Sequence, residues 1–421
     1  MVQYGGNEVS ALVFDIGASS SKAGYAGSDA PCHVWSSVGA CKDSAIHLGH
    51  FSDSLYRSAD WSRAPIVNGL VADWDALEAN WSYAYDSALR TPAADHPLML
   101  TEAAWSDPAQ REKLAELAFE KFNVPALYIA PSPVLAAFSA ARSTALVIDS
   151  GAEVTSVVPV LDSFVMKKAI RRQALAGDFV TAQAASYLEK EYGRTPLVPQ
   201  YMVSSKQGVD PDCDPVFVAR EGVEASPSFH ARALAKCMAD FKETVCANLE
   251  STFDARVAQS RPKKPYEFPN GWNTSLGKLR YQIPECLFDP KQYAIPPPAA
   301  GDDAMVVDAD GGPASEFVGV QRLAHDAVQA CDTDVRSVLY TNVVLTGGNT
   351  LLPGFADRLH YELNMLAPGI RVRLHAAGST VERKYGAWIG ASILASLGTF
   401  HQLWVSKAEY EEVGAGVMES R

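Results

Sequence analysis

Two short segments with the same pattern of residue types are the clearest candidates for chemistry. Residues 11–17 read ALVFDIG, and residues 145–151 read ALVIDSG. Each is an apolar run, typical of a buried strand, that ends in an aspartate and then reaches a glycine. A turn of this kind is tight enough for backbone N–H groups to face an anion. The sequence therefore predicts two anion-binding turns that lie far apart in the chain.

The aspartates of these turns, Asp15 and Asp149, would need a cation if the anion is a phosphate. A carboxylate repels a phosphate directly, but a divalent cation with its water shell can lie between them, as magnesium usually does with nucleotides. The first turn continues through Ser19 and Ser20 to Lys22, which adds hydroxyl groups and positive charge. Two such turns, one from each domain, would grip one polyphosphate from both sides of a cleft.

A third glycine-containing turn follows the apolar run of residues 342–354, NVVLTGGNTLLPG. Gly347 and Gly348 would allow close approach of the backbone to a ligand. A structural turn before a helix explains the same residues, and both interpretations stay open. No GxxxxGK[ST] motif competes with these turns as a phosphate site.

The segments around the turns alternate between strand and helix patterns. Residues 72–89 and 107–124 have the features of helices, the second with Asp107 as its N-cap and Pro108 just inside it. At residue 145 the pattern restarts with a strand, a glycine turn and a pair of strands. Alternation of this kind predicts an α/β architecture. The restart predicts a duplicated domain, although Val/Ile-rich strands are common enough to match by chance.

Composition limits the class of protein. The 421 residues exceed what one hydrophobic core usually supports, and 48% hydrophobic with 20% charged residues is ordinary for a soluble globular chain. A net charge of −13 disfavours a general nucleic-acid binder but allows a basic protein partner. Seven cysteines without metal-ligand spacing predict reduced thiols in an intracellular protein. The sequence shows no signal pattern and no apolar run long enough for a membrane span, so we expect no membrane partner.

Two segments interrupt the alternating pattern. Residues 190–232 mix Pro, Gly, Ser and Asp, and residues 291–316 combine a proline run with acidic and glycine-rich stretches typical of a mobile loop. We interpret both as surface insertions, which either carry partner contacts or serve none. Residues 261–265, RPKKP, are either a nuclear import signal or a solvated basic cluster.

Four segments together resemble the family of actin and actin-related proteins. They read FDIGASSSKAGYAGSDAP, VIDSGAEVTSVVPV, LTGGNTLLPGFADRL and ERKYGAWIGASILASLGTFHQLWVSKAEYEE. In that family these are the phosphate loops, the adenosine motif and the C-terminal helices. The resemblance covers most of the chain outside residues 37–66 and the two insertions.

The resemblance implies a duplicated α/β fold, with four subdomains in two domains around a nucleotide cleft. The first domain would comprise residues 1–139 and 386–421, with a reduced subdomain at 37–64, and the second would comprise residues 140–385 with the two insertions. In that family ATP and a divalent cation, magnesium or calcium, occupy the cleft.

The resemblance also implies a set of nucleotide-binding residues. Asp15 and Asp149 would hold the cation through water. The two phosphate loops transfer directly, whereas the match around Lys242 crosses an insertion. The full set is Asp15, Gly17, Ala18, Ser19, Ser20, Lys22, Asp149, Ser150, Gly151, Gly177, Lys242, Glu243, Gly347, Gly348, Asn349, Leu351 and Lys384.

The positions that would support hydrolysis depart from the family pattern. The family places a glutamine and a histidine around the attacking water and an acidic residue in the second phosphate loop, where this chain has Ser132, Ser156 and Ala152. Phosphoryl transfer to water depends on positioning the nucleophile, and serine is too short for that role while alanine offers no hydrogen bond. We therefore expect ATP binding with little or no hydrolysis and no catalytic residue. The alternative is that another side chain, such as Glu153, compensates.

The segments that join subunits in actin filaments also differ. Residues 42–64 are shorter than the family's filament loop, and the second inter-subunit plug, after residues 283–290, is replaced by the acidic insertion. A filament repeats one heterologous interface indefinitely. Loss of both sides of that interface predicts a protein that does not polymerise with itself.

Within the family, this pattern most resembles the nuclear subgroup of chromatin remodelling and histone acetyltransferase complexes. The resemblance implies a nuclear protein with roles in transcription regulation and DNA repair. Its partners would be monomeric actin and a helical scaffold segment of a remodeller ATPase or acetyltransferase-complex subunit, bound in a groove. Histones are a further candidate partner because the chain is acidic. Two other functions stay open, a cytoskeletal filament or capping subunit and an ATP-hydrolysing enzyme of the sugar-kinase or chaperone class.

Overall fold

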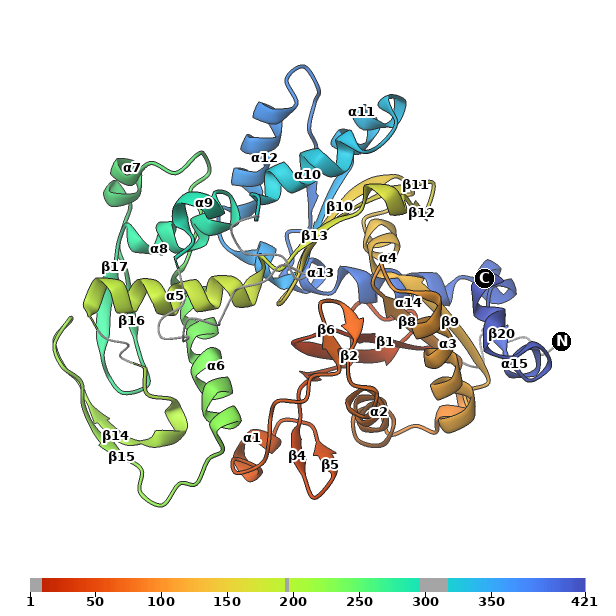
Figure 1. The fold of residues 1–421 in the computed structure, drawn as a ribbon, viewed down its shortest axis with the longest axis horizontal. Coiled ribbons are helices and arrows are strands. Elements are labelled where there is room, and N and C mark those ends of the chain that lie inside the picture. The colour runs from red at the N-terminus through yellow and green to blue at the C-terminus, as the bar shows by residue number, and fades with distance from the viewer. Residues whose placement is uncertain (1–9, 194–196, 296–316, 421) are drawn as a thin grey trace.

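The computed structural model describes residues 10–193, 197–295 and 317–420, and contains two large sheets (Figure 1). The first sheet has the strand order β20-β9-β8-β1-β2-β3. Its strands are β1 (Leu12–Ile16), β2 (Ser20–Tyr25), β3 (His33–Ser36), β8 (Leu98–Glu102), β9 (Ala126–Pro131) and β20 (Val405–Ser406). The second sheet has the order β12-β11-β10-β18-β19, and β13 pairs with β11. Its strands are β10 (Ala145–Ser150), β11 (Thr155–Leu161), β12 (Phe164–Val165), β13 (Arg171–Gln173), β18 (Val343–Thr346) and β19 (Leu374–Ala376).

The two sheets are built around the same element. Strand β1 forms an antiparallel hairpin with β2 and runs parallel to β8 on its other side. Strand β10 likewise forms an antiparallel hairpin with β11 and runs parallel to β18. The predicted duplicated α/β architecture is therefore confirmed. We call described residues 10–139 and 386–420 the first lobe and described residues 140–385 the second lobe; the domain boundaries themselves stay a prediction.

Helices of the first lobe begin where the sequence places capping residues. Helix α2 (Trp74–Tyr83) begins after Asp73, which accepts a hydrogen bond from the Ala76 N–H at 3.0 Å. Helix α3 (Pro108–Glu116) begins after Asp107, which accepts one from the Gln110 N–H at 2.7 Å. Each cap satisfies a backbone donor that has no partner within its helix. Both helices continue as π-helical turns, Ala84–Leu89 and Leu117–Lys121.

Two helices lie between the lobes and pack closely on each other. Helix α4 (Ser132–Ser139) directs Leu135 into the core of the first lobe and Ala136 into a cluster that contains Val147 and Val158 of the second sheet. Helix α14 (Gly386–Ser396) lies against α4, and the Trp388 indole N–H donates to the Val13 carbonyl at 3.0 Å. These two helices form the layer that joins the lobes behind the cleft.

The second lobe has the larger hydrophobic core. Helices pack on both faces of its sheet (Figure 1). Inside it, the Arg358 guanidinium pairs with the Glu285 carboxylate at 2.6 and 2.9 Å. The helices of this lobe are α5 (Gly177–Tyr192), α6 (Pro227–Val245), α7 (Ala255–Ser260), α8 (Leu279–Gln282), α9 (Pro290–Tyr293), α10 (Val320–Gln329), α11 (Thr333–Thr341), α12 (Phe355–Leu366) and α13 (Thr380–Lys384). Helix α15 (Lys407–Val413) closes the first lobe near the C-terminus.

The segments without a periodic pattern contain short ordered elements. Residues 37–66 include the hairpin of β4 (Ala40–Lys42) and β5 (Ala45–His47) and the short helix α1 (Ser52–Leu55). Residues 190–232 include the hairpin of β14 (Val203–Gln207) and β15 (Val216–Ala219), and α6 already begins at Pro227. Sequence reasoning missed these elements because the strands are short and their residues show no clear alternation of polar and apolar types. Residues 296–316, most of the second expected insertion, lie outside the described residues.

Two composition-based expectations can be compared with the structure. All seven cysteines lie in the described ranges as free thiols, which agrees with the predicted reduced state. Within the same ranges, no helix combines the length and the apolar character needed to cross a lipid bilayer.

The close contact of α4 with α14 leads to the first prediction. A Cβ atom at Gly390 would lie 1.9 Å from the Leu135 carbonyl oxygen, a backbone atom that cannot move aside alone. We expect Gly390→Ala to lower the free energy of unfolding by about 1–3 kcal/mol, because the helices must separate. Gly398→Ala is the matched control, since no atom lies within 4 Å of a Cβ at that position. Urea denaturation of both variants measures the difference, and equal stabilities would contradict the prediction.

Candidate functional site

A cavity of about 630 Å³ lies between the lobes, and both predicted anion-binding turns line it. Its size is typical of pockets for nucleotide-sized ligands. Residues from both lobes and from the third glycine turn meet in this one space. Of the nucleotide-binding residues expected from the sequence, the lining includes Asp15, Gly17, Ala18, Ser19, Ser20, Lys22, Asp149, Gly151, Gly177, Lys242, Glu243, Gly347, Gly348, Asn349, Leu351 and Lys384.

The first turn connects β1 to β2 and is held by its own backbone. The Gly17 N–H donates to the Ser20 carbonyl at 3.1 Å, and Asp15 lies opposite Lys22 in the hairpin register. The Asp15 carboxylate has two side-chain partners. It accepts a hydrogen bond from the Thr101 hydroxyl at 2.7 Å and forms an ion pair with the Lys22 ammonium at 2.9 Å. Lys22 therefore neutralises Asp15 in this arrangement, while its position on the cavity wall also places its charge near any bound anion.

The second turn connects β10 to β11 with matching geometry. The Gly151 N–H donates to the Val154 carbonyl at 3.0 Å, the counterpart of the bond in the first turn. Asp149 lies opposite Ser156 in the register, where the first turn has a lysine. Asp149 thus has a serine opposite it where Asp15 has a lysine. The negative charge of Asp149 is therefore less well compensated than that of Asp15.

Asp149 is the most perturbed carboxyl group of the cavity. Burial and, to a smaller extent, the neighbouring Asp15 charge raise its pKa to about 6, although Lys22 opposes the shift. Two carboxylates that share a poorly solvated space destabilise each other unless a cation lies between them. Among the described residues, no group of three or more His, Cys, Asp or Glu side chains could hold a metal ion directly. Two carboxylates, Asp15 and Asp149, are a donor set that fits a hydrated divalent cation, and the cation itself stays a prediction.

The third glycine turn approaches Asp149 too closely for any side chain. Gly347 has a φ of +94°, and a Cβ atom there would lie 2.4 Å from the Asp149 carboxylate and 2.3 Å from the Ser150 carbonyl. The turn leads directly into a 3-10 helix, Gly348–Leu351. Both interpretations of this turn are thus compatible with the structure, because it is a structural turn that also lines the cavity.

Ser150 is the expected site residue that the structure does not bring to the cavity. Its hydroxyl is paired with the Thr155 hydroxyl at 2.7 Å and accepts from the Asn349 amide at 3.0 Å. The side chain is 1% exposed. Ser150 therefore ties the second and third turns together from behind the cavity.

Residues of the second lobe form the other wall of the cavity. The Lys242 ammonium donates to the Gly177 carbonyl at 2.9 Å, and burial lowers its pKa while the Glu243 and Asp178 charges oppose the shift. Asp178, which also lines the cavity, has a pKa raised by burial and lowered in part by Lys242. A nucleotide base or ribose would meet a wall that offers both donors and acceptors.

The three positions that depart from the hydrolytic pattern do lie at this cavity. Ser132, Ala152 and Ser156 all line it. The alternative candidate, Glu153, is also there, but its carboxylate accepts a hydrogen bond from the Asn68 N–H of the first lobe at 2.8 Å. Burial raises the pKa of Glu153, and this hydrogen bond opposes the shift. Glu153 is thus engaged in a contact that crosses the cleft.

A second contact across the cleft lies beside the first. The Arg172 guanidinium of the second lobe lies 5.1 Å from the centre of the Trp105 ring, and the Trp105 indole N–H donates to the Asn68 carbonyl at 3.1 Å. Sequence reasoning missed these residues, and it also missed Thr101 beside Asp15. Thr101 alone had a usable signal, since it follows the apolar residues 98–100, a run typical of a buried strand, at the edge where parallel strands place their site residues.

Comparison with known proteins agrees with the fold. The protein family described as Actin matches residues 6–421. A protein named actin-related protein 4 from Yarrowia lipolytica is 35% identical to this chain over 427 residues, which cover 98% of this chain and 95% of that protein. Proteins of the same name are 38% identical over 397 residues in Mycosarcoma maydis (87% of this chain, 74% of that protein) and 32% identical over 452 residues in Arabidopsis thaliana (99% of each).

The unpaired charge of Asp149 leads to the second prediction. In nucleotide-free protein at pH 7.5, we expect Asp149→Asn to raise the free energy of unfolding, by an amount on the order of 2 kcal/mol. The carboxyl pKa is near 4 in the unfolded chain and about 6 when folded, so the destabilisation by the charge is full above pH 6 and absent below about pH 4. The same variant should lose most of the stabilisation that magnesium and ATP give the unsubstituted protein.

Thermal unfolding at pH 4 to 8, with and without magnesium–ATP, measures both effects of Asp149→Asn. Asp326→Asn is the matched control, because this partly exposed carboxylate of the second lobe pairs with Arg322 one helical turn away. A stripped Asp149→Asn protein that is less stable than the unsubstituted protein would contradict the electrostatic interpretation.

Proposed function

The chain belongs to the actin family, and from this premise we propose that it is an ATP-binding, non-filamentous subunit of nuclear chromatin remodelling and histone acetyltransferase complexes. The observation that carries the proposal is the pair of mirrored turns at Gly17 and Gly151, which face one cavity from the two lobes. The nuclear assignment rests on the resemblance of the sequence motifs to the nuclear subgroup. The relatives with the name actin-related protein 4, which span nearly the whole chain, support membership of a related group.

In this proposal ATP with a divalent cation, magnesium or calcium, is a structural ligand. Asp15 and Asp149 would hold the cation through water, and the cation supplies the charge that relieves their repulsion. The backbone of the two glycine turns would face the phosphates, and the walls near Gly177, Lys242 and Gly347 would face the nucleoside. A ligand that contacts both lobes stabilises the folded protein in proportion to its affinity and concentration.

Slow or absent hydrolysis of ATP is supported by the types of side chain at the described part of the cavity and by the contacts that these side chains make. A water molecule near the terminal phosphate needs a positioned acceptor. Ser132 and Ser156 have short side chains, and Ala152 has no polar atom. Three glutamates line the cavity: Glu102 is ion-paired with Arg111, Glu153 accepts a hydrogen bond from Asn68, and Glu243 lies beside Lys242 on the wall proposed to face the nucleoside. These contacts favour a bound nucleotide that stays intact over an enzyme of the kinase or chaperone class.

The absence of self-polymerisation is supported by the short segment between β4 and β5. Asp43 and Ser44 form the whole turn of this hairpin, both with positive φ. Further along, Trp61 is buried with Ala40 and Ala59, whereas Phe51 and Leu55 of α1 are 77% and 71% exposed. This part of the chain therefore offers no long loop for insertion into a neighbouring subunit, which favours the proposed monomeric subunit over a filament former.

The proposed partners, monomeric actin and a scaffold helix, would use the apolar surface at the end of α14. Ile393, Leu397 and Leu403 are 38–42% exposed on this helix and the residues just after it. The four-residue spacing of the first two places them on one helix face. An amphipathic helix could lay its apolar side along such a surface. Histones remain a proposed partner on the basis of the chain's net charge alone.

The third prediction tests hydrolysis by restoring the family residues. We expect the purified protein to retain ATP without turnover, and the triple variant Ser132→Gln, Ala152→Asp, Ser156→His to hydrolyse ATP about tenfold faster or more, because water regains positioned acceptors. Ser156→Ala is the control and should not change the rate. Single-turnover phosphate release, with melting temperatures to confirm folding, measures the effect. Hydrolysis by the unsubstituted protein at the rate of conventional actin would contradict the proposal.

The fourth prediction tests assembly. In magnesium and salt that polymerise actin, light scattering coupled to size-exclusion chromatography should show this protein alone as a monomer, and a one-to-one complex with monomeric actin bound to a scaffold helix. Ile393→Asp should weaken that complex tenfold or more, because a charge replaces an apolar contact. Phe164→Asp, at a 78% exposed apolar residue of the second lobe, is the matched control. Filaments of the pure protein, or equal effects of both variants, would contradict this part of the proposal.

A further inference from the structure

We propose that a basic surface of the second lobe binds the phosphate backbone of double-stranded DNA without reading its sequence. The surface is centred on the hairpin of β16 (Lys264–Glu267) and β17 (Asn273–Leu276), and it includes α7 and the start of α8. The choice of DNA as the polyanion rests on the proposed function in chromatin complexes. We call this region the basic hairpin surface, and its cations are Arg256, Arg261, Lys263, Lys264, Lys278 and Arg280.

The stretch that contains these cations is basic within an acidic chain. Residues 255–284 contain six lysine and arginine residues and one acidic residue, Glu267, whereas the whole chain has a net charge of −13. At an ionic strength of 0.1 M, charges more than about 10 Å apart are largely screened from each other. A phosphate group at this surface therefore responds to the local positive charge more than to the net charge of the chain.

The hairpin brings lysines from its two strands to the same end. Lys264 lies opposite Leu276 in the register, so Lys263 directly precedes β16 where Lys278 closely follows β17. The stem of Lys263 lies against Gly277, where a Cβ atom would be 3.5 Å from the Lys263 Cγ and 3.8 Å from its Cε. Two exposed ammonium groups are thus held at one end of the hairpin, although they are 15 positions apart in the chain.

The acidic side chains in and beside this stretch already have partners. Glu267 pairs with Lys206 of β14 at 2.6 Å, and Glu250 pairs with Arg261 at 2.7 Å. Asp254 accepts hydrogen bonds from two backbone N–H groups in the first turn of α7. Among the described residues, no carboxylate forms an ion pair with the other five cations of the surface, which are Arg256, Lys263, Lys264, Lys278 and Arg280.

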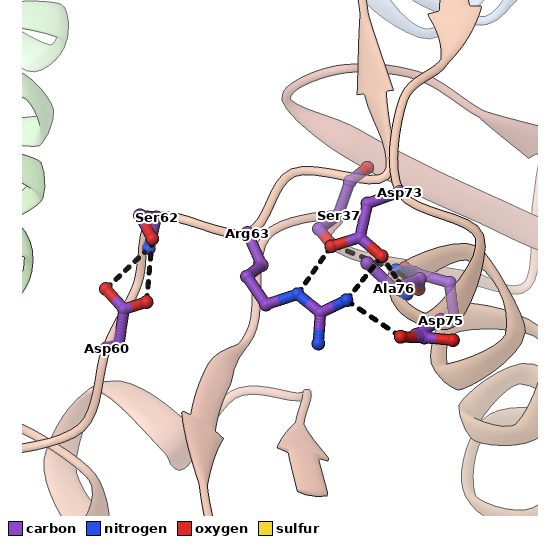
Figure 2. Close-up of polar contacts among 8 residues, drawn as sticks. Ser37, Asp60, Ser62, Arg63, Asp73, Asp75 and Ala76 are labelled. Carbon is purple, nitrogen blue, oxygen red and sulfur yellow. Dashed lines mark hydrogen bonds and ion pairs between the residues drawn. The ribbon is translucent and has the colours of Figure 1, made fainter. Parts of the chain in front are cut away.

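An arginine of the first lobe shows the opposite situation (Figure 2). Arg63 donates hydrogen bonds to Asp73 at 2.5 and 2.7 Å and to Asp75 at 3.0 Å. Its charge is compensated by two carboxylates, so it has little attraction left for an anion in solution. The five unpaired cations of the basic hairpin surface have no such compensation. Their positive potential therefore extends into the solvent.

The basic hairpin surface is fixed to the body of the second lobe. The Arg280 guanidinium donates to the Val245 carbonyl at 2.9 Å and to the Pro262 carbonyl at 3.3 Å. At the other end of the hairpin, Phe268 and Trp272 are buried in the core of this lobe. The residues RPKKP, 261–265, are thus attached to folded structure and do not form a free extended segment. This favours a binding surface over a nuclear import signal.

Charge without apolar side chains fits nucleic acid better than an acidic protein segment. Protein interfaces depend on buried aromatic and apolar side chains at their centre. Within residues 255–284, Val257 alone is a large apolar residue with high exposure, at 42%. A DNA duplex presents a dense array of phosphates that basic side chains contact without apolar groups. The buried turn of the hairpin cannot enter a groove, so we expect contacts to phosphates only.

The basic hairpin surface lies far from the docking surface proposed on α14. Figure 1 shows α7, β16 and β17 at one end of the long axis of the molecule and α14 toward the other end. DNA and a scaffold helix would therefore bind at the same time without competing. In this arrangement the subunit holds DNA beside the assembly that it belongs to.

The experiment is a titration of a fluorescein-labelled DNA duplex of 30 base pairs with the full-length protein, followed by fluorescence anisotropy at 50 to 200 mM sodium chloride. We expect the logarithm of the affinity to fall with the logarithm of the salt concentration with a slope of about −3, as for about three to four phosphate contacts. The double variant Lys263→Glu, Lys278→Glu should bind about tenfold more weakly or worse at 50 mM salt. Its slope should be shallower by about 2, because two contacts are lost.

A matched control separates the surface from the net charge. Lys42→Glu, Lys121→Glu makes the same change in net charge at two exposed lysines of the first lobe. This control should bind DNA within about twofold of the unsubstituted protein, and melting temperatures confirm that both variants fold. Equal binding by the two double variants would overturn the inference. A preference of more than tenfold for one duplex sequence over another would overturn recognition of the backbone alone.

Two further outcomes separate this inference from its alternatives and from the proposed function. Polyglutamate should displace the DNA only at a much higher concentration of charge, and displacement at equal charge would assign the surface to acidic proteins instead. If the unsubstituted protein binds magnesium–ATP but no DNA, this inference fails and the proposed nucleotide binding stands. If it binds DNA through Lys263 and Lys278 but no ATP, the proposed function fails and the basic hairpin surface stands.

Discussion

The structure depends on one electrostatic constraint, which is that two carboxylates from different lobes share a poorly solvated cavity. Asp15 has a lysine and a threonine as partners, whereas Asp149 has no comparable cation and its pKa is raised. Like charges in this position drive the lobes apart. The closed arrangement therefore requires something that offsets the repulsion, either a cation with its phosphate ligand or contacts between the lobes elsewhere. This molecule has residues suited to both.

The fold places these carboxylates together by repeating one element. In each lobe a central strand runs into a glycine turn and returns as a hairpin, with a parallel strand on its other side. Because the ends of both central strands point to the space between the sheets, the two turns face each other. Helices α4 and α14 lie between the sheets, and the close approach of Gly390 to Leu135 fixes these two helices against each other.

Sequence reasoning predicted this local chemistry because a strand and its turn are encoded within a few residues. The two Asp-x-Gly turns and the helix caps at Asp73 and Asp107 lie close to where the residue types indicated. Contacts between residues that lie far apart in the chain are not indicated by any local pattern of residue types. Nothing in the polar stretch around Trp61 indicates that its ring packs on Phe229, since that partner follows 168 positions later and the pairing exists only once the lobes meet. The inward position of Ser150 was missed for the same reason, because its partner Asn349 comes from the third turn.

The position of α14 connects the state of the cleft to the surface proposed for partners. Its first residues lie at the cavity, where Ala387 is part of the lining and Gly386 approaches Thr346 of the second lobe. Its far end carries the exposed apolar residues Ile393 and Leu397. A change in the angle between the lobes must alter the contact of α14 with the second lobe, because a Cβ atom at Gly386 would lie only 2.9 Å from the Thr346 hydroxyl. A ligand that keeps the lobes closed therefore also holds the proposed docking surface in a single conformation. That is a physical reason for a structural subunit to retain a nucleotide it does not hydrolyse.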